Sequence, residues 1–306
     1  MRLMTAALAG LLASTACAPS PTLIALAETR TPITFSQLLA RPRAAADHRT
    51  AYGPDALQFG ELWLPQGRGR HPVIVLIHGG CWRADLPGTE LMDYMAADLR
   101  DRGYAVWNIE YRRIGHAGGG YPGTFLDIAA GLDHLRVLAP QHGLDLRRVA
   151  VSGHSAGGHL ALWAAARDRL PAESPLHTAD PLPIRGVVSL AGITDLDAYR
   201  QTGPDACGGP STIDGLVGAQ QTGGRDIFAD TSPPAMLPLG DRQVVISGAL
   251  DPIVPPRFGR DYAAAAAARG DPARSVVLEG AGHFEVIDPT SAAWPRVLDA
   301  FADFLN

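Results

Sequence analysis

The chain of 306 residues contains no lysine, because all 26 of its basic residues are arginines. This absence excludes mechanisms that depend on a lysine amine, including Schiff-base chemistry, a Ser-Lys dyad and a phosphate-binding P-loop. The 31 acidic residues give a net charge of −5, and a mildly acidic chain is a poor binder of polyanions. We therefore expect no nucleic-acid partner.

The sequence also lacks a convincing set of metal ligands. No group of cysteine, histidine or carboxylate residues has the spacing that metal sites use. We expect neither a metal ion nor an organic cofactor.

The apolar stretch at the N-terminus is short of a membrane span. It covers residues 3–16, follows Met1-Arg2 and resembles an export signal. Cleavage before Cys17, in the lipobox-like Ser14-Thr15-Ala16-Cys17, would leave a lipid-anchored chain, whereas cleavage after Ala25-Leu26-Ala27 would leave a soluble one. We predict a signal at residues 1–27 and an exported protein, which is periplasmic, secreted or anchored to the membrane through Cys17. The alternative is a disordered apolar tail.

Cysteine is scarce, with three in the chain. If Cys17 is lipidated or removed, Cys81 and Cys207 remain as a pair that an oxidising compartment could join. Two unrelated thiols are the alternative, because sequence alone does not give the distance between them.

What the chain does contain is an alternation of apolar strands and helices. After a polar linker at residues 28–50, the alternating segment 57–64 predicts a strand at a sheet edge. Continuous apolar runs, typical of strands buried on both faces, follow at 73–77, 105–109, 149–152, 187–190, 244–247 and 276–278. Helical stretches lie between them near 90–102, 122–138, 156–167, 258–269 and 293–305. This order predicts one α/β domain at residues 51–306, with a mainly parallel, doubly wound sheet covered by helices on both faces.

One stretch interrupts this alternation. Residues 195–238 are rich in Gly, Pro, Asp and Gln and show little periodicity. Long irregular excursions within a compact domain often cover functional sites, so we predict a cap-like insertion here.

The segment Gly153-His154-Ser155-Ala156-Gly157 lies between a predicted strand and a predicted helix, which is the setting of a nucleophile elbow. The two glycines suit a turn so tight that side chains would collide with neighbouring backbone. The helix N-terminus behind the serine favours developing negative charge. We predict Ser155 as the nucleophile.

The segment His78-Gly79-Gly80-Cys81-Trp82 ends the apolar run 73–77. Chemistry at an acyl carbon needs donors aimed at the oxyanion, and glycines let the backbone approach the substrate closely. We assign the oxyanion hole to the backbone N–H groups of Gly80, Cys81 and Ala156. Trp82 and His154 flank this hole, and we predict them as walls of the substrate pocket.

A serine hydroxyl needs a histidine base and a carboxylate to orient that base, here in the order Ser, acid, His. Asp251 follows the predicted strand 244–247, and His283 lies in a glycine-rich loop after 276–278, so both belong at the carboxyl edge of the sheet. Asp195, which also follows a strand, is the alternative acid. We expect His159 to be a packed or hydrogen-bonded core residue.

A further charged group follows the predicted strand 105–109. The segment Glu110-Tyr111-Arg112-Arg113 is interpreted as an ion pair near the sheet edge.

Together these motifs resemble the α/β-hydrolase superfamily over about residues 50–306. Within it, the segments 78–82 and 153–160 are similar to the small carboxylesterases that include acetyl esterases, feruloyl esterases and kynurenine formamidases. Kynurenine formamidases usually carry an aromatic residue where Cys81 stands and are expected in the cytosol. The same catalytic apparatus serves esters, formamides and some peptides.

We therefore expect a serine hydrolase that cleaves a small-molecule carboxylic ester through an acyl-enzyme. One alternative is an amidase, arylformamidase-like or a small peptidase, that takes an amide substrate with the same triad. The other is a non-catalytic hydrolase fold that serves as a binding module.

Overall fold

One sheet of eight strands organises the described residues, which are 31–67, 69–221 and 223–305 of the computed structural model. The strand order is β1-β2-β4-β3-β5-β6-β7-β8. β1 and β2 pair antiparallel, β2 and β4 pair antiparallel, and every other pairing is parallel. The strands are β1 (His48–Ala51), β2 (Phe59–Trp63), β3 (His71–Ile77), β4 (Ala105–Ile109), β5 (Leu144–His154), β6 (Gly186–Leu190), β7 (Arg242–Gly248) and β8 (Ala273–Leu278).

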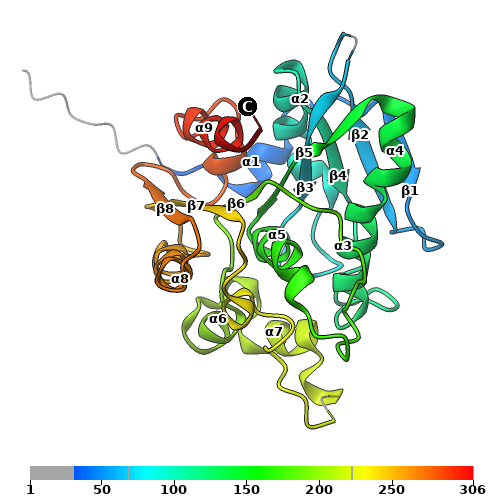
Figure 1. The fold of residues 1–306 in the computed structure, drawn as a ribbon. Coiled ribbons are helices and arrows are strands. Elements are labelled where there is room, and N and C mark those ends of the chain that lie inside the picture. Colours follow the sequence, from blue (N-terminus) through cyan, green and yellow to red (C-terminus); the bar gives the residue numbers. More distant parts are fainter. Residues whose placement is uncertain (1–30, 68, 222, 306) are drawn as a thin grey trace, which may run out of the picture. The chain divides into compact units, whose positions relative to one another are not determined.

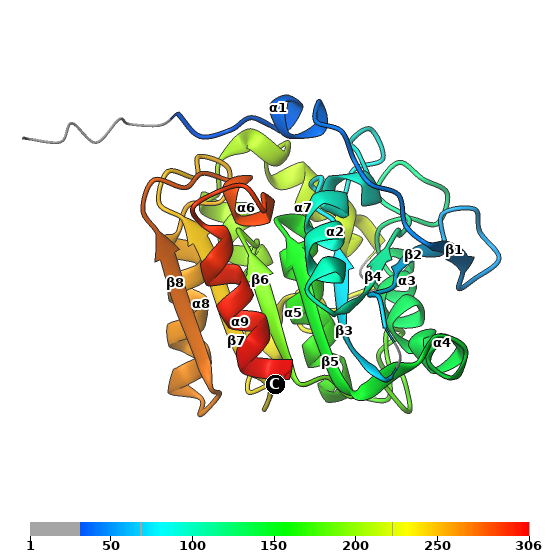
Figure 2. The same ribbon diagram turned by 90° about the horizontal axis from the view of Figure 1, so that it is seen from above.

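Helices cover both faces of this sheet (Figures 1 and 2). One face packs against α1 (Phe35–Leu39), α2 (Asp93–Asp101) and α9 (Trp294–Leu305). The other packs against α3 (Gly123–Asp133), α4 (Leu135–His142), α5 (Ala156–Ala166) and α8 (Arg257–Ala268). In β3 the side chains alternate between the two cores: Val73 and Val75 lie in the α5 core, while Ile74 lies in the core of α2 and α9. This alternation explains the unbroken apolar run and confirms the predicted doubly wound sheet.

The predicted polar linker at 28–50 is wrong in part, because α1 and most of β1 lie within it. Thr34 and Gln37 form a capping box at the start of α1, and Leu38 is fully buried in the core of α2 and α9. Two elements this short carry too few apolar residues to show a period in sequence. Since β1 pairs with β2, the strand predicted at the edge is one place inside it.

The predicted irregular insertion is also wrong in part, since residues 195–238 contain α6 (Leu196–Thr202), α7 (Pro210–Val217) and three short 3₁₀ turns. Asp195 caps the start of α6, and Gly218 in left-handed conformation ends α7. Both helices bury apolar side chains in the α5 core. These helices have seven and eight residues and end at glycines, so they are too short to show a helical period in the sequence.

The predicted signal at residues 1–27, including Cys17, lies outside the described residues. Across the part of the chain that the structure describes, no helix is long and apolar enough to cross a lipid bilayer.

Candidate active site

Ser155 lies on a tight turn between β5 and α5. Its φ of 56° and ψ of −118° place it in a strained region that non-glycine residues rarely adopt. The backbone N–H of Ser155 donates to the carbonyl of Leu190 at 2.9 Å, which ties the turn to the end of β6. A side chain at Gly157 would overlap the carbonyl oxygens at the end of β3, and one at Gly153 would overlap the carbonyl of Gly157. The two glycines therefore have the steric role that the sequence predicted.

The loop after β3 runs directly against this turn. A Cβ placed on Gly79 would lie 3.2 Å from the Cβ of Ser155. Gly80, Cys81 and Trp82 then follow with φ values of 102°, 50° and 54°, and the N–H of Arg83 donates to the carbonyl of Gly80 at 2.9 Å. Three successive residues in left-handed conformation make a compact turn beside the serine.

Within the described part of the chain, the backbone donors assigned to the oxyanion hole have no hydrogen-bond acceptor. Among the described residues, no oxygen accepts a hydrogen bond from the N–H of Gly80 or Cys81. The N–H of Ala156 is the first in α5, where no intrahelical acceptor exists. These groups are available to stabilise negative charge on a ligand.

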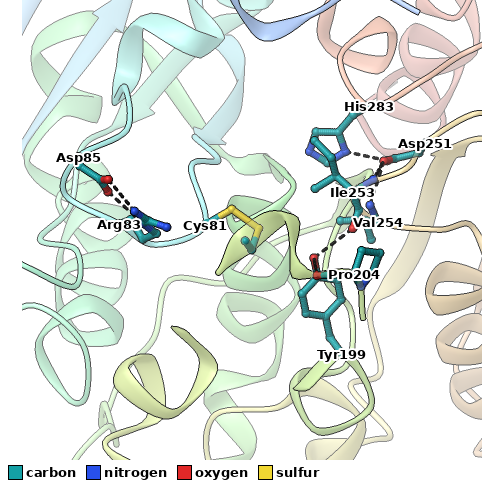
Figure 3. The surroundings of a disulfide bond; sticks show 10 residues. Cys81, Arg83, Asp85, Tyr199, Pro204, Asp251, Ile253, Val254 and His283 are labelled. Atoms are coloured by element: carbon teal, nitrogen blue, oxygen red, sulfur yellow. Dashed lines mark hydrogen bonds and ion pairs between the residues drawn. A yellow bond between two sulfur atoms is a disulfide. The ribbon is translucent and has the colours of Figure 1, made fainter. Parts of the chain in front are cut away.

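His283 and Asp251 lie together at the carboxyl edge of the sheet, in the loops after β8 and β7 (Figure 3). The two atoms His283 Nδ1 and Asp251 Oδ2 are 2.7 Å apart. The other carboxylate oxygen, Oδ1, accepts hydrogen bonds from the N–H groups of Ile253 at 2.8 Å and Val254 at 2.9 Å. Both side chains are buried. Because the carboxylate holds the proton on Nδ1, Nε2 of His283 remains the ring nitrogen that can accept a proton.

His154 supports the loop that carries His283. Its Nε2 lies 2.8 Å from the carbonyl oxygen of His283, and the two rings have centroids 4.5 Å apart. Burial, with the neighbouring His283, lowers the pKa of His154 well below its ordinary value, so this imidazole is neutral at pH 7.

The prediction that Trp82 and His154 form the pocket walls is not met, since Trp82 has no exposed surface and His154 has 1%. The Trp82 ring instead packs edge-on against His159. Sequence placed both residues beside the turn and the loop, but it does not show to which side of the backbone a side chain points.

Two other residues have structural roles. His159 is buried, its Nε2 lies 2.8 Å from the carbonyl of Thr231, and burial lowers its pKa to about 4. It is the packed, hydrogen-bonded core residue that the sequence predicted. Asp195, the alternative acid, accepts a hydrogen bond from the N–H of Ala198 at 3.0 Å as the cap of α6.

A buried charged network lies behind the loop after β3, where the sequence predicted an ion pair near the sheet edge. Glu110 Oε1 lies 3.0 Å from Nε2 of His78 and 3.5 Å from the guanidinium of Arg113. The Tyr111 hydroxyl donates to the carbonyl of His78 at 2.9 Å. Arg113 also donates to the carbonyl of Leu86 at 2.6 Å. The network therefore anchors both ends of the turn that carries the N–H groups assigned to the oxyanion hole, a role that sequence reasoning missed. The sequence feature that could have indicated this role is the charged segment directly after a buried strand.

The charge of Glu110 is expected to stabilise the fold in a pH-dependent way. Burial raises the pKa of Glu110, but the interactions with His78, Arg113 and the Tyr111 N–H outweigh it and lower this pKa to about 2. A lowered carboxylate pKa contributes stability that is present above the ordinary pKa of about 4.5 and is lost as the pH falls towards 2. We expect Glu110→Gln to lower the free energy of unfolding by about 3 kcal/mol at pH 7.

Urea unfolding at pH 7 and pH 3 measures this difference, with the exposed Glu279→Gln as the matched control. The loss of unfolding free energy in Glu110→Gln should be smaller at pH 3 than at pH 7. The control should stay close to the wild type at both pH values. An equal deficit at the two pH values would show that the charge of Glu110 is not its cause.

The eight-stranded sheet and the strained turn at its carboxyl edge define an α/β-hydrolase fold, and solved esterases share it. A truncated carbohydrate esterase from gut microbiota superposes with a TM-score of 0.70 at 21% identity, covering 85% of this chain and 96% of that one. Esterase B from Lactobacillus rhamnosis superposes with a TM-score of 0.69 at 20% identity, covering 88% of this chain and 88% of that one. The propionate-bound esterase 2 from Thermogutta terrifontis superposes with a TM-score of 0.66 at 20% identity, covering 84% of this chain and 93% of that one.

Residues 61–265 match the BD-FAE family, and the chain belongs to this family. Among curated proteins, esterase LipC of Mycobacterium tuberculosis is 29% identical over 84% of this chain and 64% of its own length. Hydrolase LUC6 of a Fusarium species is 35% identical over 37% of this chain and 28% of its own length. The chain therefore spans less than two thirds of the length of these relatives.

Proposed function

We propose that the protein is a serine hydrolase of carboxylic esters, with Ser155 as nucleophile, His283 as general base and Asp251 as the carboxylate that orients it. The observation that carries this proposal is the 2.7 Å contact between His283 and Asp251 at the sheet edge that also bears the strained Ser155. The fold shared with solved esterases and the likeness to esterase LipC support an ester as the substrate.

In the proposed cycle, Nε2 of His283 takes the proton of the Ser155 hydroxyl as its oxygen attacks the acyl carbon. The tetrahedral oxyanion receives hydrogen bonds from the N–H groups of Gly80, Cys81 and Ala156. His283 then protonates the leaving alcohol, and the acyl group remains on the serine oxygen. A water molecule then gives a proton to His283 as its oxygen attacks the acyl carbon. The bond to the Ser155 oxygen breaks, this oxygen takes the proton back from His283, and the carboxylic acid leaves.

Export of the chain is a second part of the proposal. A disulfide joins Cys81 and Cys207, and such bonds persist in oxidising compartments. With the signal-like residues 1–27, this bond supports a periplasmic, secreted or lipid-anchored protein. Intact mass of the membrane-associated and soluble fractions distinguishes a diacylglyceryl group on Cys17 from cleavage after Ala27.

The test of the function is rapid-mixing kinetics with p-nitrophenyl acetate. A burst equal to the enzyme concentration, with an acetyl group on the peptide that contains Ser155, is the expected result. Turnover of matched anilides without turnover of esters would instead identify an amidase. If the folded protein is inactive on both substrates, the remaining interpretation is a non-catalytic binding module.

A further inference from the structure

The insertion contacts both halves of the proposed active site. At one end, the disulfide joins Cys207, at the end of a 3₁₀ turn, to Cys81 in the loop after β3, with the two Cα atoms 5.3 Å apart (Figure 3). Of the two interpretations that the sequence left open, the pair is therefore correct and the unrelated thiols are not. The residue held in this way supplies one of the proposed oxyanion donors.

At the other end, the insertion holds the loop of the catalytic acid. The hydroxyl of Tyr199 in α6 donates to the carbonyl of Ile253 at 3.0 Å and lies 3.4 Å from the carbonyl of Pro204. The N–H of the same Ile253 donates to Oδ1 of Asp251. Burial, with the charge of Asp251, raises the pKa of Tyr199 to about 12, so the hydroxyl keeps its proton. In Figure 3, Tyr199 and Pro204 lie below the pair of His283 and Asp251 and to the right of the disulfide.

We propose that residues 196–207 form a strut that sets the position of the oxyanion donors relative to the acid and base, with Cys207 and Tyr199 as positioning residues. This inference rests on the proposed function. Its physical basis is that Cys81 and Trp82 both hold positive φ values without being glycines. Such conformations persist only where the surrounding structure enforces them. Catalysis depends steeply on this placement, since a misplacement of about 1 Å can cost about 100-fold in rate.

The strut requires that Cys81 and Cys207 are joined by the disulfide and are not free thiols. A dithiol reductant breaks the S–S bond by donating two electrons and two protons, so that two thiols form and the reductant becomes a cyclic disulfide. Cys81 then keeps its backbone N–H but loses the covalent link to the insertion. We expect kcat to fall and KM to change little, because the donors act on the oxyanion of the transition state rather than on the bound ester.

The experiment compares Cys207→Ser, Tyr199→Phe and the double variant in ester hydrolysis. Gln201→Ala is the matched control, since this exposed side chain lies on the same helix. We expect kcat to fall about 10- to 100-fold in Cys207→Ser, less in Tyr199→Phe, and not at all in the control. The affinity for a trifluoromethyl ketone, which forms an oxyanion on the serine, should fall in parallel. A strut also predicts that Tyr199→Phe costs less once Cys207→Ser has already freed the other end.

If a variant does not fold, the wild type can be reduced with dithiothreitol instead. Titration of the two thiols then confirms the reduction, and circular dichroism checks the fold. Activity should fall on reduction and return on reoxidation. A lower melting temperature with unchanged kcat and unchanged ketone affinity would overturn the inference and leave a disulfide that only stabilises the fold. A wild type that hydrolyses no ester would instead overturn the proposed function, so the two failures are distinct.

Discussion

Replacing Ser155 with alanine is expected to lower kcat/KM for a p-nitrophenyl ester by about 10⁴- to 10⁶-fold and to remove the burst. The variant loses the oxygen that would form the acyl-enzyme. Alanine has the same Cβ as serine, so the strain at a φ of 56° is unchanged. The melting temperature should therefore stay close to that of the wild type.

Ser152→Ala is the matched control for this measurement. Ser152 lies in β5, which leads into the turn, and its hydroxyl donates to the carbonyl of Val188 at 2.8 Å. Its loss should cost about 1 kcal/mol of stability and leave the activity in place. If Ser155→Ala kept more than about a tenth of the wild-type activity while remaining folded, the nucleophile would have to lie elsewhere, since loss of a true nucleophile costs far more.

The second large effect is expected for Asp251→Asn, which should lower kcat about 10³- to 10⁴-fold. Asparagine keeps an oxygen for the N–H groups of Ile253 and Val254, so the loop retains its form. The amide NH₂ would then face Nδ1 of His283 in place of Oδ2. This contact favours the tautomer with its proton on Nε2, which cannot accept the proton of Ser155.

Steady-state kinetics across the pH range, with Asp195→Asn as the matched control, test this prediction. Asp195 caps α6, and asparagine caps a helix about as well as aspartate, so the control should remain active. Equal losses in both variants would contradict the assignment of Asp251. The loss should be largest near neutral pH and smaller at alkaline pH, where hydroxide can assist the attack.

The sheet and the turn at Ser155 could be predicted from the sequence because both depend on neighbours along the chain. Buried parallel strands need continuous apolar runs, and the turn needs the glycines at 153 and 157. The same locality explains the errors at residues 28–50 and 195–238, where helices and strands of four to eight residues carry too little pattern. His154 shows a second limit, since its position was evident but the direction of its side chain was not.

By itself, the sequence determined the class of fold, the absence of lysine chemistry and the order of the chemically competent residues, because these follow from composition and short-range spacing. The tertiary structure alone decided which distant residues meet. It brought Cys207 to Cys81 across 126 positions, Tyr199 to the carbonyl of Ile253, and Glu110 to His78. These contacts depend on the order in which strands and loops pack side by side, and neither propensity nor periodicity encodes that order.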